Sequence, residues 1–232
     1  MRMQSMEIDR FERRCLRWAS RVASLSVLCV VLGSCTHSLT VSGRIPTPLI
    51  EPFPVSIGFI RPPEFSTQIH REKLPRGGGD WTIELGALQN AFFETLIDSL
   101  FEKVWPLAAP ACGPSTAGLA TGERCPDGFV RLTLLEYAFL PPELSGLKFF
   151  SASTKYQLEL MGSDGTVLDT WVVVGYGKNE GGGFQPTDAL NAASVEAIRD
   201  AGARVALEWP KQRNVQTWLN SIGVKNDPKP IM

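Results

Sequence analysis

The feature that most constrains this chain is an apolar run near its N-terminus. The run extends from Val22 to Gly33 and ends just before Cys35. Its 12 residues would form a helix of about 18 Å, at roughly 1.5 Å per residue, whereas the apolar core of a bilayer is about 30 Å thick. The run is therefore too short to span a membrane. Five arginines between Arg10 and Arg21 precede it, as is typical of a secretory signal peptide.

The end of the run, Leu32-Gly33-Ser34-Cys35, resembles the lipobox of bacterial lipoproteins. The resemblance implies that residues 1–34 are a signal peptide that is removed. It also implies that the Cys35 thiol carries a diacylglycerol and that the new amino group carries a further acyl chain such as palmitate. Several chains hold a protein firmly on a membrane, whereas one is a marginal anchor. Thr36 stands where an aspartate would signal inner-membrane retention, so the implied location is the periplasmic side of the outer membrane.

The alternative for this segment is an N-terminal amphipathic helix. Residues 25–32 are apolar on every face rather than on one stripe, so we favour the signal peptide. Removal of residues 1–34 leaves one domain's length of chain. We expect a Pro-rich tether over residues 35–54, a single domain over 55–224 and a disordered tail over 225–232.

The charge of the mature chain argues against nucleic acid as a partner. The signal peptide removes six arginines and three acidic residues, which leaves 17 basic against 21 acidic residues, a net charge of −4. A mildly acidic surface gains nothing from the release of counterions by phosphates. The partners that we expect are the membrane, through Cys35, and another envelope protein.

Cysteine usage follows from the compartment. Cys15 and Cys29 leave with the signal peptide and Cys35 takes the lipid, so Cys112 and Cys125 remain. In an oxidising compartment this pair is predicted to form a disulfide, which would stabilise its Pro/Gly-rich loop by about 3 kcal/mol in the chain-entropy model. A metal site needs further ligands nearby, and a redox-active pair is typically Cys-x-x-Cys.

Hydrophobic periodicity in the mature chain predicts an α+β fold. A change of phase at Leu134-Leu135 predicts a β-bulge, and Ser163-Asp164-Gly165 predicts a hairpin turn. The order of elements predicts two layers, a mainly antiparallel sheet with two main helices packed on one face. We expect strands over 55–60, 65–72, 81–85, 129–139, 155–160 and 167–176, and helices over 86–104, 187–208 and 215–222.

By element order alone, this domain resembles small envelope lipoproteins with a helix-backed sheet, such as the lipopolysaccharide-assembly lipoprotein. The resemblance implies a role as a plug, adaptor or assembly factor. No motif residue carries it, so it transfers no site.

The glycine-rich segment from Gly175 to Gly183 lies between a predicted strand and a predicted helix, where phosphate-binding loops occur. It has neither a Gly-Lys-Ser/Thr sequence nor strict Gly-x-Gly-x-x-Gly spacing. We therefore interpret it as a flexible loop and expect no nucleotide.

Two function classes remain. The first is a non-enzymatic interaction or assembly module without a cofactor or metal, and the second is a periplasmic hydrolase. The mature chain has only His37 and His70 as histidine bases, so a hydrolase would depend on carboxylates such as Glu64, Glu136 and Glu159. We favour the interaction module.

The predicted strand over residues 65–72 is the expected partner contact. Phe65, Ile69 and His70 stand beside a Pro-Pro stop and a glycine-rich turn, which favours a sheet edge with unpaired backbone groups. The alternative is an edge that the charged residues 71–73 guard against pairing. The sequence does not separate the two.

The lipobox gives a direct test. When the chain is expressed in a bacterium, the wild type should gain the mass of acyl chains and partition into the detergent phase, whereas Cys35→Ser should do neither. Mass spectrometry and detergent partitioning measure both properties. Equal partitioning of the two proteins would exclude lipidation at Cys35.

Overall fold

A computed structural model describes residues 36–110, 125–180 and 186–224. The chain divides into two units, Met1–Thr36 and His37–Met232. The signal peptide, Cys35, Cys112 and the predicted tail all lie outside the described residues, so these predictions stay predictions.

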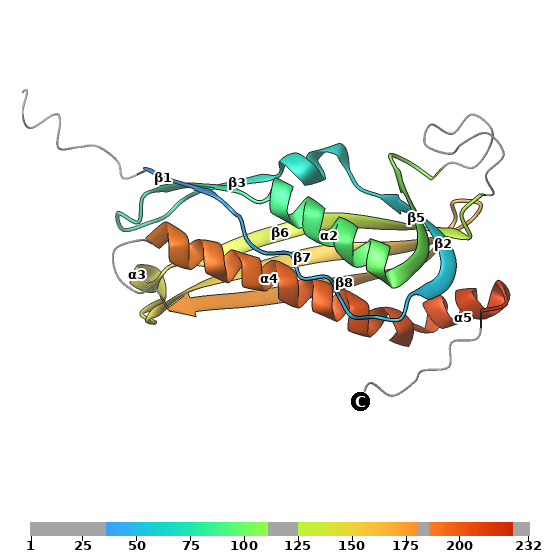
Figure 1. Cartoon of the computed structure of the whole chain (residues 1–232). Helices are drawn as coiled ribbons and strands as arrows, with labels where there is room; N and C mark the ends of the chain where they lie inside the picture. Colours follow the sequence, from blue (N-terminus) through green and yellow to red (C-terminus); the bar gives the residue numbers. More distant parts are fainter. Residues whose placement is uncertain (1–35, 111–124, 181–185, 225–232) are drawn as a thin grey trace, which may run out of the picture. The chain divides into compact units, whose positions relative to one another are not determined.

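The larger of two sheets has five strands in the order β5-β2-β6-β7-β8 (Figure 1). Strand β2 pairs in parallel with both β5 and β6, whereas β6, β7 and β8 pair antiparallel. The sheet is therefore mixed. It is mainly antiparallel, because the antiparallel pairs are much longer than the parallel ones. The strands are β2 (Phe53–Ile60), β5 (Phe101–Leu107), β6 (Gly128–Leu140), β7 (Phe149–Gly162) and β8 (Val167–Glu180).

The smaller sheet has three strands in the order β1-β4-β3. Its strands are β1 (Thr36–Thr40), β3 (Ile69–Lys73) and β4 (Asp80–Glu84). Aromatic contacts join it to the C-terminal end of β6 and the N-terminal end of β7, since the centroid of the Trp81 ring lies 5.3 Å from that of Phe139 and 6.4 Å from that of Phe150.

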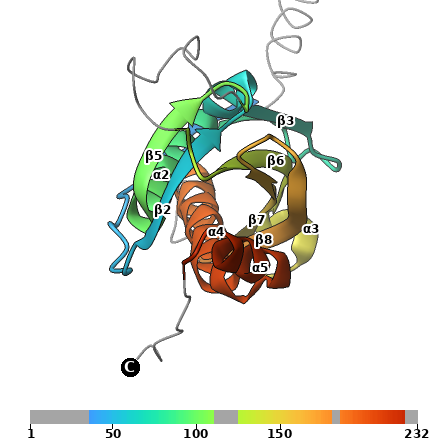
Figure 2. The ribbon, with the colours of Figure 1, turned by 90° about the vertical axis from the view of Figure 1, so that its right-hand side faces the viewer.

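Two long helices, α2 (Gly86–Leu100) and α4 (Pro186–Glu208), pack on one face of the five-stranded sheet. Figure 2, which looks along the strands, shows the sheet curving around α4. The predicted α+β fold is therefore confirmed. The shorter helical elements are η1 (Pro63–Thr67), α3 (Pro142–Ser145), η2 (Trp209–Lys211) and α5 (Arg213–Ser221).

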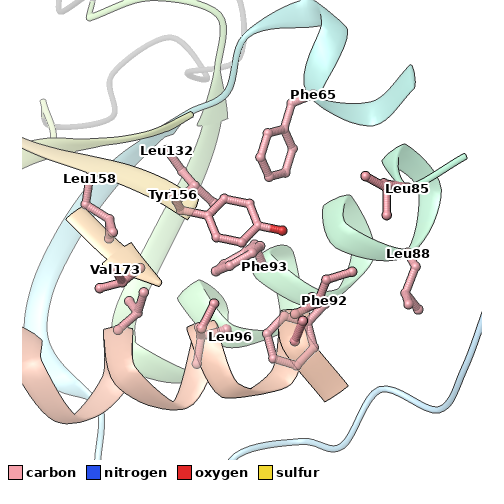
Figure 3. Close-up of a cluster of buried hydrophobic side chains, with 14 of the residues drawn as sticks. Phe65, Leu85, Leu88, Phe92, Phe93, Leu96, Leu132, Tyr156, Leu158 and Val173 are labelled. Atoms are coloured by element: carbon pink, nitrogen blue, oxygen red, sulfur yellow. The ribbon is translucent and has the colours of Figure 1, made fainter. Parts of the chain in front are cut away.

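Tyr156 is the centre of the core between α2 and the sheet (Figure 3). Its ring packs edge-on against Phe93 with centroids 4.7 Å apart. Its hydroxyl donates to Gln89 Oε1 at 3.1 Å, and Gln89 Nε2 donates to the Phe65 carbonyl at 2.7 Å. Burial raises the pKa of Tyr156, so it stays a neutral donor. This buried chain of hydrogen bonds fixes η1 and α2 on the sheet.

Helix α4 lies unusually close to β8. A Cβ atom at Gly175 would lie 2.0 Å from the Ala197 carbonyl oxygen, and one at Gly177 would lie 2.0 Å from the Ala193 carbonyl oxygen. Glycine is therefore required on the strand, and the small alanines on the helix permit the approach. The expected flexible loop is wrong for residues 175–180, which belong to β8. Residues 181–185 lie outside the described part.

The first long helix ends earlier than predicted. It ends at Leu100, and β5 begins at once with Phe101 in an extended conformation, so residues 101–104 are strand. Parallel pairing with β2 and the contact of Phe101 with Trp209 at 5.1 Å outweigh the helical periodicity. Pro106 fits in β5 because this strand is a sheet edge, where one N–H needs no strand partner.

The predicted tether over residues 35–54 is also wrong for its described residues at both ends. Thr36–Thr40 form β1, Leu39 and Val41 are buried, and β2 begins at Phe53. The folded unit therefore starts at His37 rather than at residue 55. The predicted bulge lies between Leu134 and Glu136, and the predicted hairpin joins β7 to β8.

The close approach of α4 predicts a large cost for a single methyl group. Gly177→Ala should lower the free energy of unfolding by about 2–3 kcal/mol, because helix backbone rather than a flexible side chain occupies the space. Val174→Ala, on the solvent face of the same strand, should cost less than about 1 kcal/mol. Urea unfolding measures both. Equal costs would contradict the close packing.

Candidate docking site at the edge of the five-stranded sheet

The structure separates the three residues that were predicted to bind a partner. Phe65 lies in η1 and is only 2% exposed, so it belongs to the core and the prediction is wrong for it. Ile69 and His70 lie half-buried in β3. The His70 ring packs edge-on against Tyr137 at 5.1 Å, and its Nε2 lies 3.0 Å from Glu72 Oε2.

Strand β3 is an edge, as predicted, but its exposed residues Arg71, Glu72 and Lys73 are all charged. Charged side chains along an edge oppose strand addition. The structure therefore favours the guarded alternative for this edge.

The carboxylates that were considered as catalytic groups lie apart. Glu159 on β7 accepts a hydrogen bond at 2.7 Å from Arg131 on the neighbouring strand β6. Glu136 on β6 is paired with Lys155 on β7. At about 3.4 Å per residue these two positions are separated by roughly 13 Å or more along the strands. Glu64 is exposed in η1. Within the described ranges, no three His, Cys, Asp or Glu side chains gather to hold a metal ion.

Strand β8 forms the other edge of the larger sheet and exposes apolar side chains. Val172 is 43% exposed, Val174 is 48% exposed, and Tyr176 is exposed on the same face. On the opposite face Val173 is buried beneath α4. A row of exposed apolar side chains on an unpaired edge is a feature that soluble proteins usually avoid.

Three outward N–H groups of β8 are satisfied by carboxylates. The Tyr176 N–H donates to Asp200 Oδ2 at 3.0 Å, and the Lys178 N–H donates to Glu196 Oε2 at 2.9 Å. Both acids lie on α4, one turn apart. They can reach the edge of β8 because the helix lies directly over this strand. At the other end, the Thr170 N–H donates to Asp169 Oδ1 at 2.9 Å.

The row of acceptors on α4 is interrupted at its next turn. Arg204 follows Asp200 by four residues, and its Nε donates to Asp200 Oδ2 at 3.1 Å. A guanidinium has no acceptor atom. Among the described residues no acceptor is recorded for the N–H groups of Val172 and Val174, which point away from β7 in the same alternation as Tyr176. We call residues 172–174 the open edge segment.

Helix α4 adds an apolar surface above this segment. Leu207 follows Asp200 by seven residues and therefore lies on the same side of the helix, over the edge, and it is 47% exposed. The charged groups around the segment are of both signs. The acids are Asp169, Glu196, Asp200 and Glu208, and the cations are Arg204 on α4, Lys178 on β8 and Lys155 on β7, which is paired with Val174.

Sequence reasoning did not single out β8 as an exposed edge. The signal that was available is the run Trp171 to Val174, which is apolar on both faces of an edge strand. The acids on α4 have the spacing of an ordinary solvated helix face, so only their contacts with β8 reveal their role.

Cys125 lies exposed before β6, but its predicted partner Cys112 lies outside the described residues, so their disulfide stays a prediction.

None of the described helices is long and apolar enough to cross a membrane.

Comparison with known proteins gives fold neighbours only. No model of a protein family matches the chain, and no curated protein matches it. One similar structure is a Xanthomonas campestris protein of the family DUF330, with a TM-score of 0.46 and 12% identity over 73% of this chain and 92% of that chain. Another is a Caulobacter crescentus protein described as a candidate lipoprotein, with a TM-score of 0.31 and 12% identity over 44% of this chain and 72% of that chain. Likeness at this level carries no functional argument for this chain.

The open edge segment predicts an asymmetry between neighbouring positions. Val172→Pro removes an N–H that has no strand partner, so the free energy of unfolding should change by less than about 1 kcal/mol. Val173→Pro removes an N–H that faces β7 and should cost about 1–3 kcal/mol more than Val173→Ala, which controls for the side chain. Urea unfolding of the three variants decides. If Val172→Pro were as costly as Val173→Pro, the edge would not be open.

Proposed function

We propose that this protein is a lipid-anchored envelope protein that holds an extended segment of another protein at the open edge segment of β8. The observation that carries the proposal is the pair of N–H groups at Val172 and Val174, left without acceptors among the described residues while their neighbours are capped by carboxylates. The lipobox at Cys35 supports the anchor and the compartment.

Strand addition explains the chemistry around the segment. A segment aligned with β8 would accept hydrogen bonds from Val172 and Val174, and its outward side chains would pack beside theirs. Its side chains on the face of the sheet that α4 covers would contact Leu207. Because Val172 and Val174 are exposed and apolar, the bound segment should have an apolar centre.

A second copy of this chain does not fit the same edge. Helix α4 lies directly over β8, as the contacts at Gly175 and Gly177 require. Pairing β8 with β8 of another copy on one continuous sheet would bring two α4 helices to about one strand spacing, 4.8 Å. Packed helices need about 8–10 Å between their axes. The occupant is therefore a strand without such a helix above it.

The test uses a photo-cross-linking amino acid in the host bacterium, placed at Val172 or at the control position Val167. Val167 is 56% exposed on the same strand but lies beside the hairpin turn. We expect an adduct with an envelope protein at position 172 only, at least tenfold weaker when Val174→Pro is added, and mapping to one extended peptide. An adduct that forms equally at 167, or that ignores Val174→Pro, would overturn the proposal.

A further inference from the structure

We propose that one end of this domain lies directly against the bilayer, with Leu147 at the membrane interface. This end comprises the turn between β3 and β4, residues 74–79, and the connection between β6 and β7, residues 141–148, and we call it the membrane end. The inference rests on the proposed lipid at Cys35 and adds a surface, an orientation and a second contact with lipid.

The first argument is the length of chain between the anchor and the fold. Thr36, the residue after Cys35, already begins β1. The His37 ring stacks on Trp81 with centroids 4.2 Å apart, and the Val41 N–H donates to the Glu84 carbonyl at 2.9 Å. One residue spans at most about 3.6 Å. An acylated Cys35 therefore leaves no tether that could hold the domain away from the lipid.

The second argument identifies the end. His37 lies beside Trp81 near the start of β4 and Val41 lies beside Glu84 at its end, so β1 runs alongside β4 in the same direction. The start of β1 is thus next to the turn that precedes β4. Trp81 also contacts Phe139 and Phe150, the residues that border the connection between β6 and β7. Figure 1 shows β1 and α3 at the same end of the strands.

The third argument is the chemistry of the membrane end. Leu147 is 50% exposed, and Leu140 at the end of β6 is exposed as well. Exposed leucines beside lysine and arginine are typical of surfaces that insert shallowly into a membrane interface. Pro141 and Pro142 stiffen the connection that presents them.

The charges at this end are balanced. Lys73 lies 3.8 Å from Asp80, which offsets its charge. The remaining charged groups are Arg76, Lys148 and Lys178 against Glu143, Glu180 and Asp188 in the first turn of α4. A net charge of zero gives no overall attraction to anionic lipid. The contact should therefore depend on the leucine and on the anchor more than on salt.

The opposite end of the strands provides a matched control. Strands β7 and β8 each have 14 residues, which span about 48 Å at roughly 3.4 Å per residue. Their hairpin turn carries Asp164, which is fully exposed and whose pKa is lowered by hydrogen bonds from Thr166. An ionised carboxylate in such a turn is not suited to an apolar interface. Val167 beside this turn matches Leu147 in exposure.

The experiment places an environment-sensitive fluorescent amino acid at 147 or at 167 in the full chain, purified from bacterial membranes. The protein is reconstituted in vesicles of phosphatidylethanolamine and phosphatidylglycerol, with and without brominated acyl chains. We expect a blue-shifted emission at 147 and quenching by bromine that is at least threefold stronger than at 167. Raising the salt concentration should leave the difference in place.

Two controls separate this inference from the proposed function. Mass spectrometry of the same samples reports the acyl chains at Cys35, and flotation reports binding to the vesicles. If the protein is acylated and bound but both positions are quenched equally, the membrane end is wrong while the anchor stands. If no acyl mass is found, the anchor and the membrane end both fall, whereas cross-linking at Val172 still tests the open edge segment.

Discussion

The close packing of α4 on β8 is the constraint on which the rest of this structure depends. Two glycines on the strand and a row of alanines on the helix bring the backbones together. Because the helix is so close, the side chains of Glu196 and Asp200 reach from α4 to the edge of β8 and accept hydrogen bonds from its N–H groups. The same packing that builds the core therefore also decides which part of the edge is guarded.

The elements whose signals are local could be predicted from the sequence. The β-bulge after Leu134 follows from a change of phase in one strand, and the hairpin follows from Ser163-Asp164-Gly165. Helix α4 has long apolar periodicity and a clear break at Trp209-Pro210. In each case neighbouring residues supply the information, so no knowledge of distant contacts is needed.

The errors come from contacts between distant parts of the chain. Residues 101–104 continue the periodicity of α2, yet parallel pairing with β2 makes them strand. Phe65 looks like an edge residue until its contacts with Phe93 and Tyr156 bury it. The segment after Cys35 looks like a tether because its buried residues are few, but pairing with β4 incorporates it into the fold. Which edge of a sheet stays open depends on which helix lies above which strand, and the sequence pattern of one strand does not contain that information.

β1 begins at Thr36, directly after the proposed lipidation site, so the distance of each part of the domain from the membrane would be fixed. In the proposed orientation, with the membrane end at the lipid, the strands would rise from the bilayer. The open edge segment lies six to eight residues from Glu180 at the end of β8. At about 3.4 Å per residue this is a height of roughly 20–27 Å. A rigidly held edge at a set height acts as a ruler. Under the proposed function, such an edge would select a client whose extended segment emerges at that distance from the membrane, by position rather than by affinity.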